Sequence, residues 1–194
     1  MHTIHNLTNF LEDTWVFCSL LQQETIIIYP TDTVYGIWSI ITKQTAQRIA
    51  TIKQRPASKR FSILVPSFER IDEHTSLSTR SEQLWSDYSQ TYNTNTLTLL
   101  LPVKKTSSFP WDAISDSPVI WCRHLGDHPI QALVTALWAP IITTSCNISW
   151  QQPITTAHQA VEQFGDLDLV IIDWWPCLWS PSTIIEYRTW ARVR

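Results

Sequence analysis

The stretch TIIIYPTDTVYG, residues Thr25–Gly36, decides the fold class of this sequence. Its first five residues, Thr25–Tyr29, are mostly β-branched and are closed by Pro30, which is typical of a short buried strand. The polar residues that follow begin directly after that strand, and the carboxyl ends of strands are where open α/β sheets bind ligands. A polar turn is the commoner meaning of Pro-Thr-Asp, so this stretch alone leaves both interpretations open.

Further strand patterns follow this stretch and alternate with helical ones. Short apolar runs predict strands at 62–65, 96–101, 119–123, 140–143, 167–172 and 182–187. Apolar residues near helical spacing predict helices over 10–23, 43–54, 81–88, 129–137 and 157–164. Thr42 is the expected N-cap of the second helix, and Gly165 is the expected left-handed residue that ends the last one. The predicted class is therefore α/β, with a sheet that is at least partly parallel.

Length and composition favour one globular domain over residues 1–194. The chain is 44% hydrophobic and 16% charged, and it contains no linker, repeat or low-complexity tract. No apolar run is long enough to span a membrane, and the first residues lack the basic start and apolar core of a signal peptide. The four cysteines are far apart, which fits a reducing compartment and argues against a zinc site or a disulfide framework. We expect a cytoplasmic protein without a membrane partner.

Basic residues are concentrated in one place, KQRPASK, residues Lys53–Lys59. The net charge of −3 argues against the broad basic surface of proteins that bind nucleic-acid backbone. Lys53 and Arg55 are two residues apart, so a continuous helix would point them away from each other. A frayed helix end leading into Pro56 could turn both inward onto phosphate oxygens. A solvated helix end is the plainer interpretation of the same residues.

A third unusual segment is TTSCNIS, residues Thr143–Ser149, directly after an apolar strand. Hydroxyls and an amide in a strand-to-loop turn suit a polyanion or a nucleotide. Ser145 is not surrounded by a GxSxG elbow, and the sequence has neither GxxxxGK[ST] nor GxGxxG, which excludes the common hydrolase and nucleotide motifs. The six histidines include no HExxH, so we predict no metal site built by side chains.

The order of these motifs is more specific than any one of them. YPTDTVYG is followed by KxRP, then by RxxxxHP at Arg123–Pro129, then by TSxNxS and by PSTII at Pro181–Ile185. In this order the sequence resembles the YrdC/TsaC family of threonylcarbamoyl-AMP synthases from Phe10 to Arg194. The resemblance implies a twisted mixed sheet wrapped by helices around one large, positively lined cavity.

The resemblance also implies an activity. Such enzymes are nucleotidyltransferases that join L-threonine, bicarbonate and ATP into threonylcarbamoyl-AMP and release pyrophosphate, with Mg²⁺ carried by the ATP phosphates. A partner complex then transfers the threonylcarbamoyl group to tRNA. The carbamate of threonine attacks the α-phosphate, so no nucleophilic side chain is needed, and cations stabilise the transition state.

Site residues follow from the match between this sequence and the family motifs. The resemblance implies catalytic roles for Lys53 and Arg55, which supply positive charge. It implies ATP binding by Arg55, Lys59, Ser145, Asn147 and Arg194. It implies threonine binding by Thr33, Arg123, Thr143 and Ser182. Lys59 stands where the identity of the family's ATP contact varies.

Tryptophan stands at many positions where the family pattern has glycine. The chain has 3 glycines and 11 tryptophans, whereas ordinary usage of about 7% glycine predicts roughly 14. The affected positions are Trp38, Trp121, Trp138, Trp150, Trp174, Trp175, Trp179 and Trp190. Core or stacking aromatics are the plainer interpretation of tryptophans. Our hypothesis is that the gene uses UGA codons for glycine, which have been translated as tryptophan.

Two other function classes share the expected fold. A non-catalytic module of this fold could bind tRNA through the positive cavity, although the net charge of −3 disfavours it. A detached carbamoyl-transfer domain, as in hydrogenase maturation factors, would use carbamoyl phosphate instead of threonine. This chain lacks the accompanying domains and zinc-finger cysteines of those factors. Pyrophosphate release that depends on threonine and bicarbonate distinguishes the three.

Overall fold

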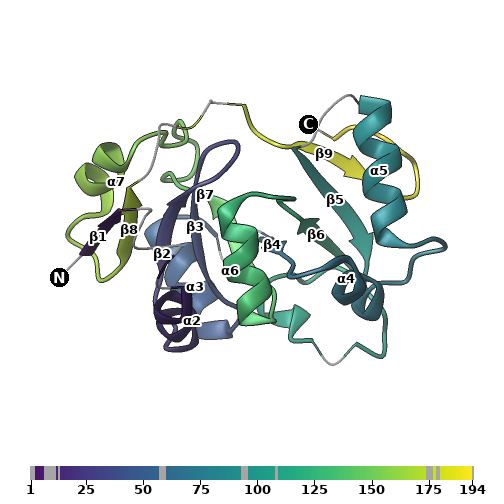
Figure 1. The fold of residues 1–194 in the computed structure, drawn as a ribbon, viewed down its shortest axis with the longest axis horizontal. Coiled ribbons are helices and arrows are strands. Elements are labelled where there is room, and N and C mark those ends of the chain that lie inside the picture. The colour runs from purple at the N-terminus through teal and green to yellow at the C-terminus, as the bar shows by residue number, and fades with distance from the viewer. Residues whose placement is uncertain are drawn as a thin grey trace.

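The computed structural model of the chain describes residues 3–6, 12, 14–56, 60–92, 96–107, 109–173, 177 and 180–193. Within them, nine strands form one sheet in the order β1-β8-β2-β3-β7-β4-β6-β5-β9 (Figure 1). The strands are β1 (Thr3–Asn6), β2 (Ile27–Pro30), β3 (Tyr35–Ile40), β4 (Ser62–Leu64), β5 (Leu97–Pro102), β6 (Val119–Arg123), β7 (Ile141–Ser145), β8 (Val170–Asp173) and β9 (Thr183–Glu186). The helices are α2 (Thr14–Gln22), α3 (Lys43–Ile52), α4 (Phe68–His74), α5 (Ser81–Tyr92), α6 (Pro129–Leu137) and α7 (Ala157–Phe164), with a short 3-10 helix η1 (Trp111–Ala113).

The sheet is mixed, and the predicted α/β class is confirmed. Parallel pairs are β1 with β8, β8 with β2, β4 with β6 and β5 with β9. The pairs β2–β3, β3–β7, β7–β4 and β6–β5 are antiparallel. Parallel partners far apart in the sequence, such as β5 and β9, bring distant segments to one edge of the sheet.

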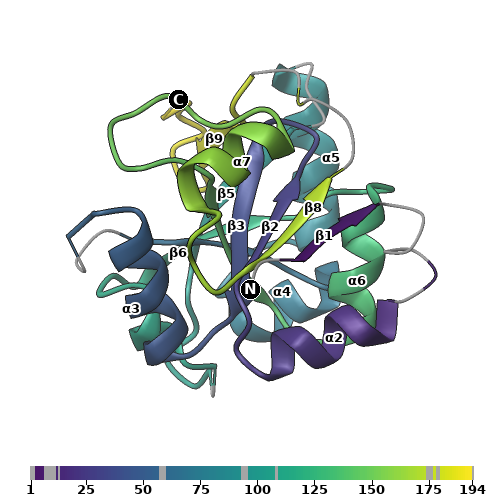
Figure 2. The same ribbon diagram turned by 90° about the vertical axis from the view of Figure 1, so that its left-hand side faces the viewer.

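Two hydrophobic cores lie on the two faces of the sheet because successive strand residues point in opposite directions. In β2 and the residue before it, Ile27 and Tyr29 join the core formed with α2 and α6, whereas Ile26 and Ile28 join the core formed with α3, α5 and α7. Figure 2 shows α2 and α6 side by side, away from α3 and α7. A strand buried on both faces reads as a continuous apolar run, as TIIIY does.

The YPTDTVYG motif is a hairpin and not only a loop after a strand. Thr31 donates its N–H to the carbonyl of Val34 at 3.3 Å, and β3 begins at Tyr35, antiparallel to β2. The strand β3 was not predicted, because its first residues, Tyr35 and Gly36, also end the polar YPTDTVYG segment. The strand β1 and the helix α4, whose N-cap is Ser67, were not predicted either.

Of the two predicted helix ends, the one at Thr42 is confirmed and the one at Gly165 is wrong. Thr42 caps α3 as predicted and forms a capping box with Thr45. The prediction for Gly165 was wrong, because its φ of −61° is right-handed. Its N–H donates to the carbonyl of Val161 at 2.8 Å, and a Cβ added to Gly165 would lie 2.4 Å from that oxygen. Glycine is required there for close approach rather than for a positive φ.

No helix among the described residues is long and apolar enough to cross a membrane.

Candidate active site

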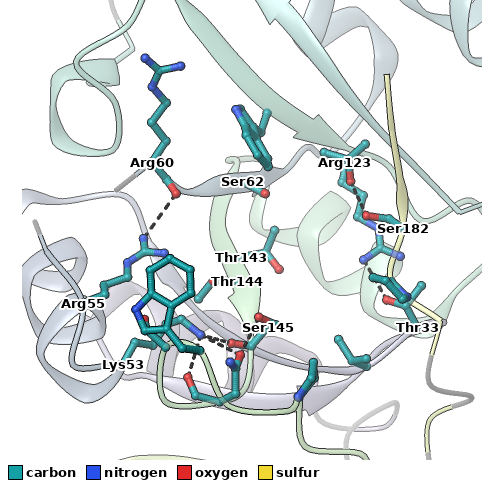
Figure 3. Close-up of a pocket in the computed structure, with 18 residues that line it drawn as sticks. Thr33, Lys53, Arg55, Arg60, Ser62, Arg123, Thr143, Thr144, Ser145 and Ser182 are labelled. Atoms are coloured by element: carbon teal, nitrogen blue, oxygen red, sulfur yellow. Dashed lines mark hydrogen bonds between the residues drawn. The ribbon is translucent and has the colours of Figure 1, made fainter. Parts of the chain in front are cut away.

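A cavity of about 530 Å³ brings together most of the predicted site residues. It lies against the middle of the sheet and is lined from β4, β6 and β7, from the end of α3 and from the segment before β9. Its lining includes Thr33, Lys53, Arg55, Arg123, Thr143, Ser145, Asn147 and Ser182 (Figure 3). Lys59 and Arg194, also predicted to bind ATP, lie outside the described residues.

The end of α3 turns both basic residues of the KxR motif toward the cavity. Lys53 is the C-cap, and Gln54 follows with a left-handed φ of 47°. Gln54 donates its N–H to Thr51 at 2.9 Å and Arg55 donates its N–H to Ala50 at 3.0 Å, the two bonds of a Schellman motif. Because the chain reverses at Gln54, two residues that a continuous helix would point apart both line the cavity.

Lys53 ties this helix end to the turn that follows β7. Its side chain is buried, with 3% of the residue exposed. Its Nζ donates to the carbonyl of Asn147 at 2.9 Å, to Asn147 Oδ1 at 3.1 Å and to the carbonyl of Ser145. In return, Ser149 donates its N–H to the carbonyl of Lys53 at 2.8 Å. The ammonium therefore both charges this part of the cavity and fixes the shape of its wall.

The polar side chains of the TTSCNIS segment are organised around Asn147. Ser145 donates its hydroxyl to Asn147 Oδ1 at 2.7 Å, and Asn147 Nδ2 donates to the carbonyls of Ile148 and Gln151, each at 2.9 Å. Cys146 between them is fully buried, and burial raises the pKa of its thiol far above neutrality. This segment therefore presents hydrogen-bonding groups to the cavity and no activated nucleophile.

Arg55 is held over an aromatic ring. Its guanidinium carbon lies 3.7 Å from the centroid of the Phe61 ring. Burial lowers the pKa of Arg55 to about 10, so the side chain remains cationic at neutral pH. Its Nη2 also donates to the carbonyl of Arg60 at 3.5 Å (Figure 3), so the ring and this bond together orient the guanidinium in the cavity wall.

The opposite side of the cavity is built around Arg123, at the end of β6. Arg123 is 8% exposed, donates to Thr33 Oγ1 at 3.2 Å and forms an ion pair with Asp32. Ser182 lies beside this group in Figure 3, and its hydroxyl is 2.8 Å from Thr98 Oγ1. Thr143 projects between the two ends of the cavity.

Some polar residues of this region were not among the predicted site residues. Asp32 is one of them, although it stands within the YPTDTVYG motif. Arg60 belongs to the basic group with Lys53, Arg55 and Lys59 that the sequence suggests as a phosphate pocket, whereas Ser62 and Thr98 line the cavity without belonging to a recognised motif. Thr98 is placed by the parallel pairing of β5 with β9, which no local pattern reveals.

The charge of the cavity differs from that of the whole chain. The described residues that line it include four cations (Lys53, Arg55, Arg60 and Arg123) and no aspartate or glutamate. A chain of net charge −3 thus concentrates positive charge at one concave site, which favours an anionic ligand. No group of three or more metal-ligating side chains occurs in the part of the chain that the structure describes.

Comparison with known proteins places the chain in a family. The model of the Sua5/YciO/YrdC family, described as "Telomere recombination", matches residues 19–194. Threonylcarbamoyl-AMP synthase from Idiomarina loihiensis is 28% identical over 166 residues, covering 84% of this chain and 85% of that protein. The enzyme of the same name from Enterobacter sp. strain 638 is 28% identical over 185 residues, covering 90% and 91% of the two chains.

A solved structure agrees with this assignment at the level of fold. P. abyssi Sua5 complexed with L-threonine matches with a TM-score of 0.79 and 23% identity over 98% of this chain. This chain spans 56% of the length of that Sua5 chain. Because the family model covers nearly all of the sequence, from the second half of α2 to the C-terminus, this chain belongs to the Sua5/YciO/YrdC family.

Proposed function

We propose that this protein is an L-threonylcarbamoyladenylate synthase, which makes threonylcarbamoyl-AMP from L-threonine, bicarbonate and ATP. The observation that supports it best is the division of one cationic cavity into two ends. Lys53 and Arg55 lie at one end with Ser145 and Asn147, and Arg123 lies at the other with Thr33 and Ser182. A polyphosphate needs the paired cations of the Lys53 end. A small hydroxy amino acid needs a guanidinium for its carboxylate and hydroxyl partners, as at the Arg123 end.

At the Arg123 end, the ligand would be the amino acid. A guanidinium can bind a carboxylate with two parallel hydrogen bonds, and Arg123 is already oriented by Asp32 and Thr33. The hydroxyls of Thr33, Thr143 and Ser182 are the groups available to a threonine hydroxyl or carboxylate. Curated relatives of this chain carry the name threonylcarbamoyl-AMP synthase, and one structural relative was solved with L-threonine.

At the other end, the chemistry requires charge neutralisation. The amine of threonine attacks the carbon of bicarbonate and forms a carbamate with loss of water, and a carbamate oxygen then attacks the α-phosphorus of ATP. A new P–O bond forms while the bond to the β-phosphate oxygen breaks, and pyrophosphate leaves with the electron pair. Lys53 and Arg55 would stabilise the negative charge that accumulates in this step. Ser145 and Asn147 would position the phosphates once ATP draws their donors away from Asn147 Oδ1 and from the carbonyls of Ile148 and Gln151. Mg²⁺ would enter the site bound to ATP.

The cavity would also protect the intermediates. Carbamates and mixed anhydrides react with water, so an enclosed site favours their use over their loss. The product would pass to a separate transferase complex that acts on tRNA in the cytoplasm. Lys59 and Arg194 would provide the remaining contacts to ATP.

The test is pyrophosphate release from ATP, measured with threonine and bicarbonate and with each omitted. We expect release only when both are present, and a loss of at least about 100-fold in Lys53→Ala and in Arg55→Ala. Lys43→Ala is the matched control, because Lys43 is an exposed lysine at the other end of α3, paired with Asp112. Wild-type rates in both Lys53→Ala and Arg55→Ala would show that these residues lack the proposed role.

Two further results would overturn the proposed activity. Pyrophosphate release that depends on carbamoyl phosphate and does not require threonine would indicate a carbamoyl-transfer domain. Salt-sensitive tRNA binding with no pyrophosphate release under any condition would indicate a binding module.

A further inference from the structure

Three tryptophans adopt a backbone conformation that favours glycine. Trp138, Trp150 and Trp190 have φ angles of 56°, 73° and 58°. They are three of the five non-glycine residues with positive φ in the described part of the chain, although tryptophan supplies only 11 of its 194 residues. For a bulky side chain this conformation is a genuine outlier, because Cβ crowds the following carbonyl oxygen.

Each of the three occupies a turn position that normally selects glycine. Trp138 follows α6 in the left-handed conformation, and its N–H donates to Val134 at 3.2 Å and to Thr135 at 3.1 Å. Trp190 donates its N–H to Glu186 at 3.0 Å, which closes a left-handed turn after β9.

Trp150 stands at the third position of a β-turn, in which Gln151 donates its N–H to Ile148 at 3.0 Å. Ser149 precedes it without a positive φ, so the signs of φ are those of a type II turn. That turn type requires a positive φ at its third position, where glycine is the usual residue.

Burial of the indoles offsets little of this strain at two of the three positions. Trp138 is 58% exposed, Trp150 is 90% exposed and Trp190 is 44% exposed. Arg70 lies 5.2 Å from the Trp138 ring, and the Trp190 ring packs edge-on against the buried Tyr88 with 4.3 Å between centroids. The large stabilisation that a tryptophan gives when its apolar area leaves water is mostly absent at Trp138 and Trp150, whereas Trp190 retains part of it.

The other tryptophans that replace expected glycines are different. Trp38 is 1% exposed and stacks on Tyr29 with 5.0 Å between ring centroids, as a core aromatic does. Trp121 lines the cavity without a positive φ. Trp174, Trp175 and Trp179 lie outside the described residues. The backbone evidence therefore concerns Trp138, Trp150 and Trp190.

From these observations we infer that positions 138, 150 and 190 are glycine in the natural protein, because their codons are UGA and the organism reads UGA as glycine. Glycine at these positions satisfies the backbone of three separate turns. Reading UGA as tryptophan would also explain both the low number of glycines and the high number of tryptophans in the sequence. The inference also changes the candidate active site. Trp150 lines the cavity beside Lys53 and Arg55, so the natural wall at this point is bare backbone and the nucleotide end is more open.

The direct test is mass spectrometry of the protein isolated from its own host. Tandem spectra of peptides spanning the three positions should show glycine, with UGA at the corresponding codons. Tryptophan in those peptides, or UGG codons at the three positions, would overturn the inference.

A second test uses recombinant protein carrying the printed sequence. Trp138→Gly, Trp150→Gly and Trp190→Gly should each raise the melting temperature by about 2–4 °C. Alanine at the same positions removes the indole and keeps a Cβ, so alanine variants should gain less than the glycine variants. Trp15→Gly is the matched control, because Trp15 is 73% exposed but lies in α2 without a positive φ, and it should gain nothing. Equal gains from glycine and alanine, or from Trp15→Gly, would contradict the backbone argument.

Discussion

Arg123 and Asp32, 91 residues apart in the sequence, form an ion pair at one end of the cavity. The strand β6 ends at Arg123, and the hairpin between β2 and β3 carries Asp32. Arg123 also donates to Thr33 Oγ1 at 3.2 Å, so two neighbouring residues of the hairpin fix the plane of one buried guanidinium. A planar donor group held in this way is suited to bidentate recognition of a carboxylate.

Replacing Arg123 by lysine should therefore weaken threonine use specifically. Lysine keeps the charge but loses the planar fork, and we expect KM for threonine to rise by about tenfold, equivalent to about 1.4 kcal/mol, with KM for ATP nearly unchanged. Steady-state pyrophosphate release with each substrate varied in turn measures both constants. Arg80→Lys is the control, since Arg80 also pairs with an aspartate, Asp72, but on the surface. An equal rise in both KM values for Arg123→Lys would argue against a role confined to threonine.

Replacing Lys53 by methionine should destabilise the fold as well as the site. The change preserves the length of the side chain and removes the donors to Ser145 and Asn147. Leaving a buried acceptor without its donor costs about 1–3 kcal/mol, so we expect the melting temperature to fall by about 2–12 °C. Thermal unfolding followed by circular dichroism measures this change. Lys43→Met removes an exposed ion pair and should have little effect, and a similar loss in both variants would show that the Lys53 contacts are not stabilising.

Replacing Gln54 by glycine should stabilise the protein. Gln54 has a φ of 47° at the left-handed position after α3, and glycine adopts this conformation without the penalty of about 1 kcal/mol that a side chain carries. The expected rise in melting temperature is about 2–4 °C. The same exchange at Gln47, which is exposed within α3, should instead lower stability by about 1 kcal/mol. No rise in melting temperature for Gln54→Gly would mean that the left-handed turn at Gln54 does not limit the stability of this helix end.

Acid should destabilise the protein partly through His128. Its Nδ1 accepts the N–H of Ile130 at the start of α6, and burial lowers its pKa to about 4 from the ordinary value of 6.5. The unfolded chain therefore binds a proton as pH falls below 6.5, whereas the folded chain does not until about pH 4. Stability from this group is complete above pH 6.5 and is lost between 6.5 and 4, by about 3 kcal/mol in total.

Chemical denaturation of wild type and His128→Asn at several pH values measures this contribution. Asparagine also caps helices, so the variant keeps a side-chain acceptor for Ile130 and removes the titration. The difference in unfolding free energy between the two proteins should change across pH 6.5 to 4 and be constant above it. A constant difference over the whole range would show that His128 is not the group that titrates.

Much of the fold could be predicted because the relevant patterns are local. The strand Val119–Arg123 and the helix Pro129–Leu137 have the predicted bounds, and Thr42 caps α3 as expected. β-branched runs closed by proline, helical spacing of apolar residues and N-cap hydroxyls depend on neighbours within about one turn of chain, so the sequence alone determines them. The order of the motifs also indicated the family, and most of the described residues predicted from those motifs line one cavity.

Tertiary structure decided how those residues are used. No local pattern indicates that Asp32 pairs with Arg123, that Lys53 reaches the carbonyls of Ser145 and Asn147, or that Thr98 joins Ser182 across β5 and β9. These contacts join segments more than 80 residues apart, and their geometry depends on strand order and register. The sequence therefore determined which segments carry the candidate site residues, because motifs are local. Only the packed sheet decided which of those residues line the cavity and which side chains hold one another in place, because that depends on which segments the topology brings together.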